Sequence, residues 1–251
     1  RALTVAFGIE IFPTETRGIK VLERGKGVST YKGSIPSVSP FALAELQLLL
    51  RRCDRLMTRV PLAHPERASK ALEWDACTLE VWKQRIRSSA VRDLVDVSAR
   101  AIFGAEPREL SFLHFLFYLN AGGGLMRLAE TTGGAQQDRF LQGAQTFSTR
   151  LAAPLGEAVT LGAPVRRIVQ TDAGVAVHTD RGVFSGRYAI VAVPPALAGR
   201  IDYEPILPGD RDQLTQRFPM GATTKVFVFY ERPFWKDAGR SGESVSSLGP
   251  L

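Results

Sequence analysis

The sequence has few of the residues that build disulfides or metal sites. Its 251 residues include two cysteines, Cys53 and Cys77, and three histidines, none at the spacing of a zinc site. We therefore expect two free thiols and no metal. No stretch approaches the ~20 apolar residues that span a bilayer, and no charged and then apolar leader opens the chain. These absences predict a soluble, cytoplasmic protein.

Several motifs of well-known enzyme sites are also missing. The dinucleotide fingerprint Gly-x-Gly-x-x-Gly does not occur, because Gly25–Gly27 and Gly122–Gly124 lack both the third glycine and a preceding apolar strand. There is no Gly-x-Ser-x-Gly elbow, and His64, His114 and His178 are too far apart to indicate a triad. The residues alone therefore support no hydrolase chemistry and specify no cofactor.

The charge of the chain is moderately basic. It carries 32 Lys and Arg against 25 Asp and Glu, a net charge of +7. The basic residues are scattered, and aromatic residues do not interleave with them as they would on a base-stacking platform. This distribution argues against nucleic-acid binding.

Apolar periodicity predicts a helical region in the first half. Residues 18–35 fit two strands joined by a turn, and from Pro40 to Tyr118 apolar residues recur at three and four, as in amphipathic helices. The strongest helix is predicted at residues 110–119, with Ser111 as its cap and Gly122–Gly124 as its end.

The second half changes to strands and back. A helix over 144–155, closed by Gly156, precedes a predicted three-strand meander, and the apolar run Tyr188–Val193 reads as the end of a strand buried on both faces. A helix over 210–217 and a strand over 223–230 follow, and the Gly/Ser-rich stretch 239–251 stops without a closing element. The chain starts at Arg1, and both ends are expected to be cut. The succession indicates two interleaved domains of mixed α and β structure.

Two features could carry chemistry. Alternation along 223–230 places Lys225 on the same face as Phe227 and Phe229, where burial would lower the pKa of the amine; alternatively, Lys225 lies on an edge strand and reaches solvent. The loop Gly133–Gln136 could approach a ligand closely and offers an amide, although a glycine pair is more often an ordinary turn. His114, among three phenylalanines, is expected to be a core or groove residue.

Several segments together resemble the flavin-containing monoamine oxidase family. They are distributed along the whole chain, in the family's order and spacing: TYKGSIP at 30–36, EWDACTLEVW at 73–82, AEPRELSFLHFLFY at 105–118, GGAQQDRF at 133–140, LGAPVRRI at 161–168, AIVAVPPAL at 189–197 and MGATTKVFVFYERPFW at 220–235.

The resemblance implies a mixed α/β fold with two interleaved domains of the FAD-linked amine oxidase type. Residues 1–12 and 141–214 would belong to the FAD domain with its β-meander, and residues 13–140 and 215–251 to the substrate domain of helices packed on a sheet. Lys225 matches the family lysine that holds a water near flavin N5, and Gln136 matches a glutamine of the substrate cavity. Ile102, Leu128 and Ala129 would line that cavity.

The cofactor implied by the resemblance is FAD. The backbone of Val165 would meet its adenine part, and Ala192, Val193 and Pro194 would lie beside it. The implied reaction oxidises a primary or secondary amine to an imine and then an aldehyde, with O2 reduced to H2O2. The N-terminal Gly-x-Gly-x-x-Gly segment and the C-terminal FAD segment of the family are missing, so a polyamine, amino-acid or porphyrinogen oxidase, or a truncated remnant without catalysis, stays open. A homodimer and the amine itself are left open too.

Overall fold

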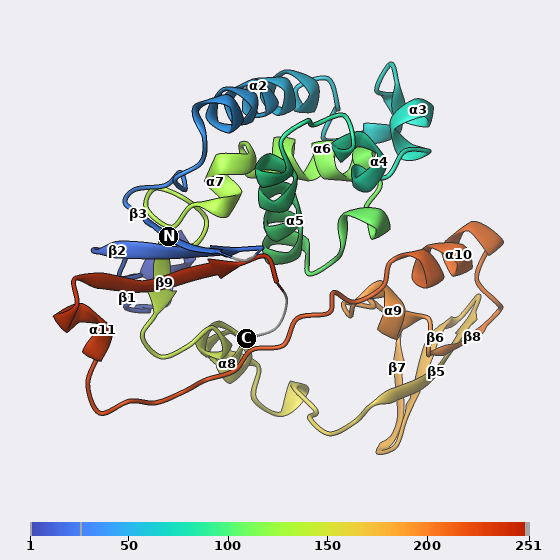
Figure 1. The fold of residues 1–251 in the computed structure, drawn as a ribbon. Coiled ribbons are helices and arrows are strands. Elements are labelled where there is room, and N and C mark those ends of the chain that lie inside the picture. The colour runs from blue at the N-terminus through green and yellow to red at the C-terminus, as the bar shows by residue number, and fades with distance from the viewer. Residues whose placement is uncertain (1, 26, 249–251) are drawn as a thin grey trace. The chain divides into compact units, whose positions relative to one another are not determined.

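The chain folds into two compact units that interleave in sequence. The computed structural model describes residues 2–25 and 27–248 (Figure 1). The first unit runs up to Gly143 and resumes at Thr223, and the second unit comprises Ala144–Ala222. The assignment of FAD and substrate functions to parts of the chain stays a prediction.

Helices form most of the first unit, as the apolar periodicity predicted. Side chains of Ser39, Thr78 and Ser111 cap the starts of three of them by accepting a backbone N–H. No helix within residues 2–25 and 27–248 is long and apolar enough to cross a bilayer. The helices are α1 (Ala2–Ala6), α2 (Pro40–Met57), α3 (Ala71–Asp75), α4 (Leu79–Lys83), α5 (Ser89–Phe103), α6 (Phe112–Gly122), α7 (Leu125–Ala129) and α11 (Phe234–Asp237), with short 3-10 turns at Pro65–Arg67 and Pro107–Glu109.

The core of this unit lies among α2 to α7, around the helix predicted at 110–119. Phe112 stacks on Trp82 with ring centroids 4.7 Å apart, and Leu116 and Leu119 of the same helix are fully buried. At the C-terminus of α6, Gly123 adopts a left-handed conformation that any other residue would enter only with strain. The predicted cap and end of this helix are both confirmed.

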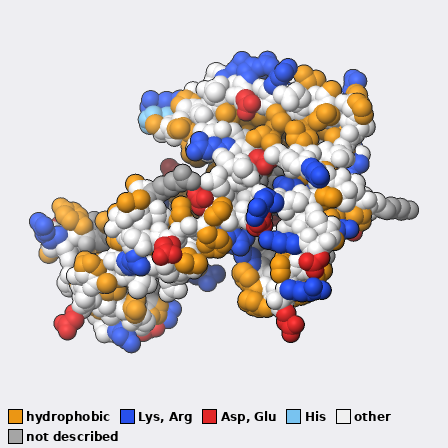
Figure 2. Space-filling view, turned by 90° about the vertical axis from the view of Figure 1, so that its left-hand side faces the viewer, with side chains coloured by type: hydrophobic (Ala, Val, Ile, Leu, Met, Phe, Trp, Pro, Cys, Tyr) orange, Lys and Arg blue, Asp and Glu red, His pale blue; other side chains and the backbone are white. Residues whose placement is uncertain are grey.

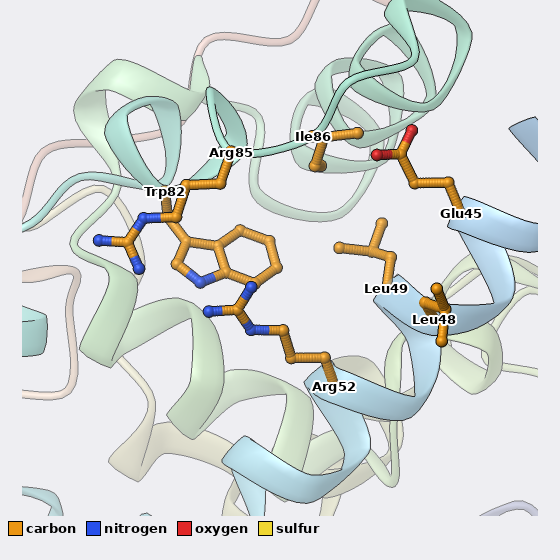
Figure 3. A pocket seen from close by; sticks show the side chains of 7 residues that line it. All are labelled: Glu45, Leu48, Leu49, Arg52, Trp82, Arg85 and Ile86. Atoms are coloured by element: carbon orange, nitrogen blue, oxygen red, sulfur yellow. The ribbon is translucent and has the colours of Figure 1, made fainter.

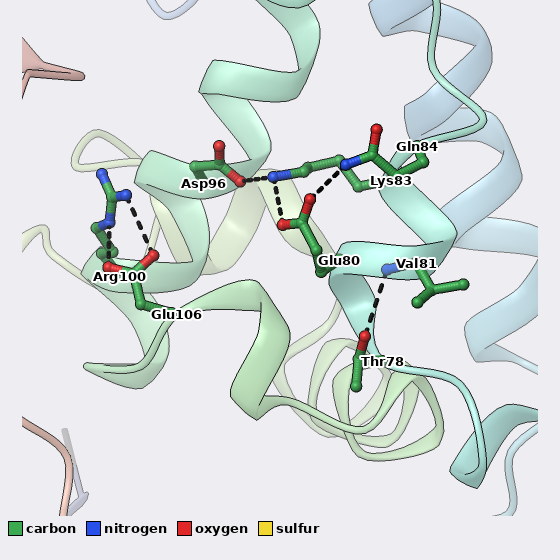
Figure 4. A network of polar contacts seen from close by, with 8 residues as sticks. All are labelled: Thr78, Glu80, Val81, Lys83, Gln84, Asp96, Arg100 and Glu106. Atoms are coloured by element: carbon green, nitrogen blue, oxygen red, sulfur yellow. Dashed lines mark hydrogen bonds and ion pairs between the residues drawn. The ribbon is translucent and has the colours of Figure 1, made fainter.

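An ion-pair network fixes α4 against α5 (Figure 4). The buried ammonium of Lys83 lies 2.6 Å from a Glu80 carboxylate oxygen and also donates to Asp96 on α5. Burial by itself lowers the pKa of Lys83, but the hydrogen bonds to Asp96 and Glu80 outweigh it and raise the pKa overall. Lys83 therefore stays charged and joins the two helices.

Two small sheets complete the first unit. Strand β1 (Ile11–Pro13) pairs antiparallel with β4 (Asp138–Phe140), and β2 (Ile19–Arg24) forms the predicted hairpin with β3 (Gly27–Tyr31). On its other edge β2 pairs in parallel with β9 (Arg240–Ser246). Strand β9 was not predicted from the sequence. The Lys20 ammonium on β2 bonds Glu243 on β9 at 3.0 Å and supports the pairing.

The second unit contains the predicted meander. Strands β5 (Val165–Thr171), β6 (Gly174–Thr179) and β7 (Gly182–Gly186) are antiparallel, and β8 (Asp202–Glu204), which was not predicted, pairs in parallel with β5. The helices are α8 (Gln145–Ala152), continued by a 3-10 turn to Ala158, α9 (Pro195–Ala198) and α10 (Gly209–Arg217).

Two strand predictions were wrong. Residues 188–193 and 223–230 form no strand, and their apolar side chains are exposed, up to 91% for Ile190 and 92% for Phe229. A strand is stable only where a neighbouring backbone accepts and donates its ladder hydrogen bonds. Within the described residues neither segment finds such a neighbour, so the apolar pattern does not become a buried strand.

Candidate functional site

The Gly/Gln loop after α7 is a compact turn held by its own backbone. Ala135 N donates to the carbonyl of Arg127 at 2.8 Å, and Gln136 N donates to the carbonyl of Glu130 at 3.3 Å. The loop therefore satisfies the carbonyls left free at the C-terminus of α7. These bonds fix the position of the loop relative to α7.

Glycine is required in this loop by close backbone packing. A Cβ on Gly134 would lie 2.0 Å from the Glu130 carbonyl oxygen, far inside contact distance, whereas Gly133 faces open space but has a φ of +74°. The close approach that the sequence predicted for a ligand is thus made, at Gly134, by the protein's own α7.

The loop is also bonded to Thr14, directly after the end of β1. Thr14 donates its backbone N–H to the carbonyl of Gln137 at 2.7 Å and its hydroxyl to the carbonyl of Gln136 at 3.0 Å. The side chains of Gln136 and Gln137 differ in their hydrogen bonds. The Gln137 side chain accepts from Gly133 N at 2.8 Å, whereas the exposed Gln136 amide bonds to none of the described residues. The amide donor and acceptor of Gln136 are therefore open to solvent.

A pocket of about 570 Å³ opens beside this loop. Its size is within the roughly 300–1,000 Å³ typical of small-molecule sites. Gln136 does not line it. Its walls come from α1, β1, α7, the loop and β4, and comprise Thr4, Ile11, Arg127, Gly133, Gly134, Ala135, Gln137, Asp138 and Phe140. Sequence reasoning missed Thr4, Arg127 and Asp138, because they are ordinary polar residues that only the fold brings together.

The apolar residues assigned to the substrate cavity lie on neighbouring helices. Ile102 near the end of α5 and Leu128 on α7 are half-buried and pack against the helical core, and the two helices contact each other. Ala129 is exposed at the end of α7, directly before the loop that carries Gln136. The structure therefore brings Leu128, Ala129 and Gln136 together on one continuous segment.

Lys225 lies on a different segment of the chain. It is exposed in the segment 223–230 and makes no ion pair or hydrogen bond with the residues that the structure describes. Because this segment is not a strand, the predicted alternation does not apply to it, and the role of Lys225 stays a prediction. Next along the chain, Tyr230 packs edge-on against Phe234 and Trp235.

The predicted cofactor contacts lie in the second unit on separate elements. Val165 begins β5 opposite Thr179 and is half-buried. Ala192, Val193 and Pro194 precede α9, where the Pro194 carbonyl accepts the N–H groups of Leu197 and Ala198 at 2.8 and 2.9 Å. The exposed apolar side chains of Tyr188, Ile190 and Val193 lead into this cap.

His114 is a packing residue, as the sequence predicted. It is half-buried on α6, beside the rings of Phe103, Phe117 and Tyr118. Burial lowers the pKa of its imidazole below the ordinary value.

Comparison with known proteins gives one consistent result. The family model of flavin-containing amine oxidoreductases matches residues 30–251. A probable flavin-containing monoamine oxidase A from Dictyostelium discoideum is 39% identical over 97% of this chain and 54% of its own length. A putative flavin-containing monoamine oxidase, AofH, from Mycobacterium tuberculosis is 37% identical over 100% of this chain and 55% of its own.

Solved structures agree in fold. Cyclohexylamine oxidase from Brevibacterium oxydans superposes with a TM-score of 0.88 and is 26% identical. The match covers 98% of this chain and 55% of the cyclohexylamine oxidase chain. The chain thus spans about half the length of the relatives it matches. The family and the mixed α and β fold predicted from the sequence are confirmed, as is FAD as the cofactor that the family uses.

Proposed function

Because this chain belongs to the family of flavin-containing amine oxidoreductases, we propose that it carries the substrate side and one wall of the flavin site of an FAD-dependent amine oxidase. The substrate would be a primary or secondary amine, deaminated to an imine and then an aldehyde while O2 is reduced to H2O2. The observation that carries the proposal is the family match over residues 30–251, which includes the predicted lysine and glutamine. The names of the two relatives reported above favour amine oxidation, and an L-amino acid dehydrogenase from Synechocystis, 35% identical over 96% of this chain, represents the amino-acid alternative.

The described residues fit part of FAD. Tyr188, Ile190 and Val193 expose a run of apolar side chains that a flat, largely apolar ring system would cover. The pyrophosphate has no Gly-x-Gly-x-x-Gly turn in this sequence. From the family resemblance we propose Val165 and Ala192–Pro194 as parts of the cofactor wall. When bound, FAD supplies the two-electron acceptor for oxidation of the amine Cα–N bond.

The side chains of this chain would position the substrate and control water. Ile102, Leu128 and Ala129 provide an apolar surface that favours the neutral amine and excludes water. The uncommitted amide of Gln136 would orient the substrate by donating or accepting one hydrogen bond. Lys225, whose ammonium has three donors, would hold a water molecule at the site where O2 is reduced.

The partners proposed are an amine and O2, in a cytoplasmic setting and without nucleic acid. Scattered basic residues support the last point, since a binding face for nucleic acid would gather them with aromatic residues. A homodimer is compatible with the proposal but no part of it.

The test is the visible absorption spectrum of the purified chain after incubation with excess FAD and desalting. We expect retained flavin that a panel of primary and secondary amines bleaches without oxygen and that air restores. Lys225→Met is expected to slow the return of colour in air by about tenfold or more, the usual scale of a lost proton-transfer contribution. Lys32→Met, at another exposed lysine, is the matched control and should leave the rate unchanged.

One result would limit the proposal and one would overturn it. A colourless protein after desalting would mean that these residues alone do not hold FAD, because the sequence has no Gly-x-Gly-x-x-Gly turn for its pyrophosphate. Retained flavin that no amine of the panel bleaches would mean that the site is not an amine oxidase.

A further inference from the structure

A second pocket lies between α2 and the segment joining α4 to α5, and none of the predicted site residues lines it (Figure 3). It measures about 170 Å³. This is below the roughly 300–1,000 Å³ of drug-sized sites, so it has room for one small ring or branched chain. Its lining residues are Glu45, Leu48, Leu49, Arg52, Trp82, Arg85 and Ile86.

The two ends of this pocket differ in polarity. In Figure 3 the guanidinium groups of Arg52 and Arg85 lie at the end beside Trp82, and Glu45 lies at the other end beyond Leu49. Arg52 stacks over the Trp82 indole at 5.3 Å from the ring centroid. The pocket therefore combines an aromatic and aliphatic floor with a doubly cationic end.

Neither arginine is neutralised by the protein. Within residues 2–25 and 27–248, Arg52 and Arg85 form no ion pair. The one carboxylate that lines the pocket, Glu45, accepts the backbone N–H groups of Arg87 and Ser88, both at 2.7 Å, and so caps the start of α5. Glu73, which lines a neighbouring pocket together with Arg85, pairs with Lys70 at 2.8 Å. Neither of these two carboxylates pairs with Arg52 or Arg85.

The backbone that carries Arg85 is fixed in place. Ile86 N donates to the carbonyl of Lys83 at 2.9 Å, and the guanidinium of Arg92 donates to the carbonyl of Ile86 at 2.6 Å. Together with the Glu45 cap, these bonds hold the α4–α5 segment against α2. A ligand would meet a preformed site with little ordering of the backbone.

The surface around the pocket also combines basic and apolar side chains. Phe41 and Leu48 are exposed on α2, at 59% and 64%, on the helical face that also carries Glu45 and Arg52. Figure 2 shows basic side chains gathered at the top of the molecule, the level of α2 in Figure 1, with exposed apolar side chains below them. A ligand with one anionic and one apolar end would match this surface.

We propose that this pocket binds a small carboxylate bearing one aromatic or branched apolar group. The carboxylate would accept hydrogen bonds from Arg52 and Arg85, and the apolar group would lie on Leu48, Leu49 and the edge of Trp82. Arginine suits this task because its planar fork matches the two oxygens of a carboxylate. The site is separate from the flavin chemistry and requires none of its residues.

The test uses the whole chain without FAD and two probes of equal shape, benzoate and benzamide. Binding is followed by ligand-observed NMR and by Trp fluorescence. We expect benzoate to bind at least about tenfold more tightly than benzamide, because only the carboxylate is paired with charge. Arg52→Gln and Arg85→Gln should each weaken benzoate binding by about tenfold or more.

The matched control is Arg51→Gln, which removes the neighbouring exposed arginine of α2 that does not line the pocket. It should change benzoate affinity by less than about twofold, the scale of a distant, screened charge. Equal binding of the two probes, no binding of benzoate, or equal losses in all three variants would overturn the assignment. Because the readout needs no flavin, a failed amine oxidase test leaves this result interpretable.

Discussion

The helical core of the first unit and the segments 188–193 and 223–230 are all rich in apolar residues, but only the core buries them. In the core, Phe112, Leu116 and Leu119 are at most 1% exposed. In the segments, Ile190 and Phe229 are more than 90% exposed. A helix satisfies its own backbone and needs only a packing face, whereas a strand also needs a neighbour for its hydrogen bonds.

The two regions are expected to contribute differently to stability and to ligand binding. Buried apolar residues stabilise the fold by roughly 1.5–3 kcal/mol for each large side chain. Exposed apolar residues contribute little of this and form surfaces that a ligand or another segment can cover. We therefore expect the core to determine stability and the exposed segments to determine function.

The largest expected effect separates the regions directly. Phe112→Ala, in the stacked pair with Trp82, should lower the free energy of unfolding by about 3–5 kcal/mol. Phe229→Ala removes the same kind of side chain at a position where it is 92% exposed. This change should alter the free energy of unfolding by less than about 0.5 kcal/mol. Urea unfolding followed by circular dichroism measures both. Similar losses for the two variants would break the comparison.

Removing the buried cation of the core should cost somewhat less. Lys83→Met leaves the Asp96 and Glu80 carboxylates without their partner, and because both are partly exposed we expect a loss of about 2–3 kcal/mol. Lys83→Met combined with Asp96→Leu should recover part of the loss, since it removes the orphaned charge. A double variant less stable than Lys83→Met would contradict this account of the network.

The two glycines of the loop after α7 differ in how closely they pack against the helix, so their substitution should have different effects on stability. Gly134→Ala must displace the Glu130 carbonyl and should destabilise the protein by about 2 kcal/mol, whereas Gly133→Ala only strains its own φ and should cost about 1 kcal/mol. Thermal unfolding gives the order. If Gly133→Ala were the more damaging of the two, the close packing of the loop on α7 would be wrong.

The smallest effect is a pH dependence of stability. Hydrogen bonds from Lys83 and Arg100 lower the pKa values of Glu80 and Glu106 below 4.5. This stabilisation is therefore present above pH 4.5 and is lost as the pH falls through the lowered values. Glu106→Gln should cost under about 1 kcal/mol at pH 7 and less at pH 3. A loss that is equal at both pH values would exclude the ion pair as its source.

Sequence reasoning succeeded where the pattern and its partner lie in the same stretch of chain. The Ser111 cap, the Gly123 end, the hairpin at 19–31 and the meander at 165–186 are local, and each was predicted. Strand β9 was missed because its parallel partner β2 lies more than 200 residues earlier. The strands expected at 188–193 and 223–230 failed for the same physical reason, since alternation cannot specify a neighbour.

The candidate site followed the same rule. The spacing of GGAQQ identified the loop and Gln136, because the motif is contiguous. Thr4 and Arg127, which line the adjoining pocket, lie outside this motif on α1 and α7, and no local signal marks them. The arginine pocket between α2 and the α4–α5 segment was likewise visible only in the structure.

Hydrogen exchange of the chain with and without FAD tests the central claim most directly. The account predicts that amides of 188–193 and 223–230 exchange freely without FAD, while those of α6 are protected. Added FAD should slow exchange in 188–193, the proposed cofactor wall, and leave α6 unchanged. Exchange in 188–193 that stays equally fast with bound FAD would contradict the claim that these exposed apolar residues form the flavin site.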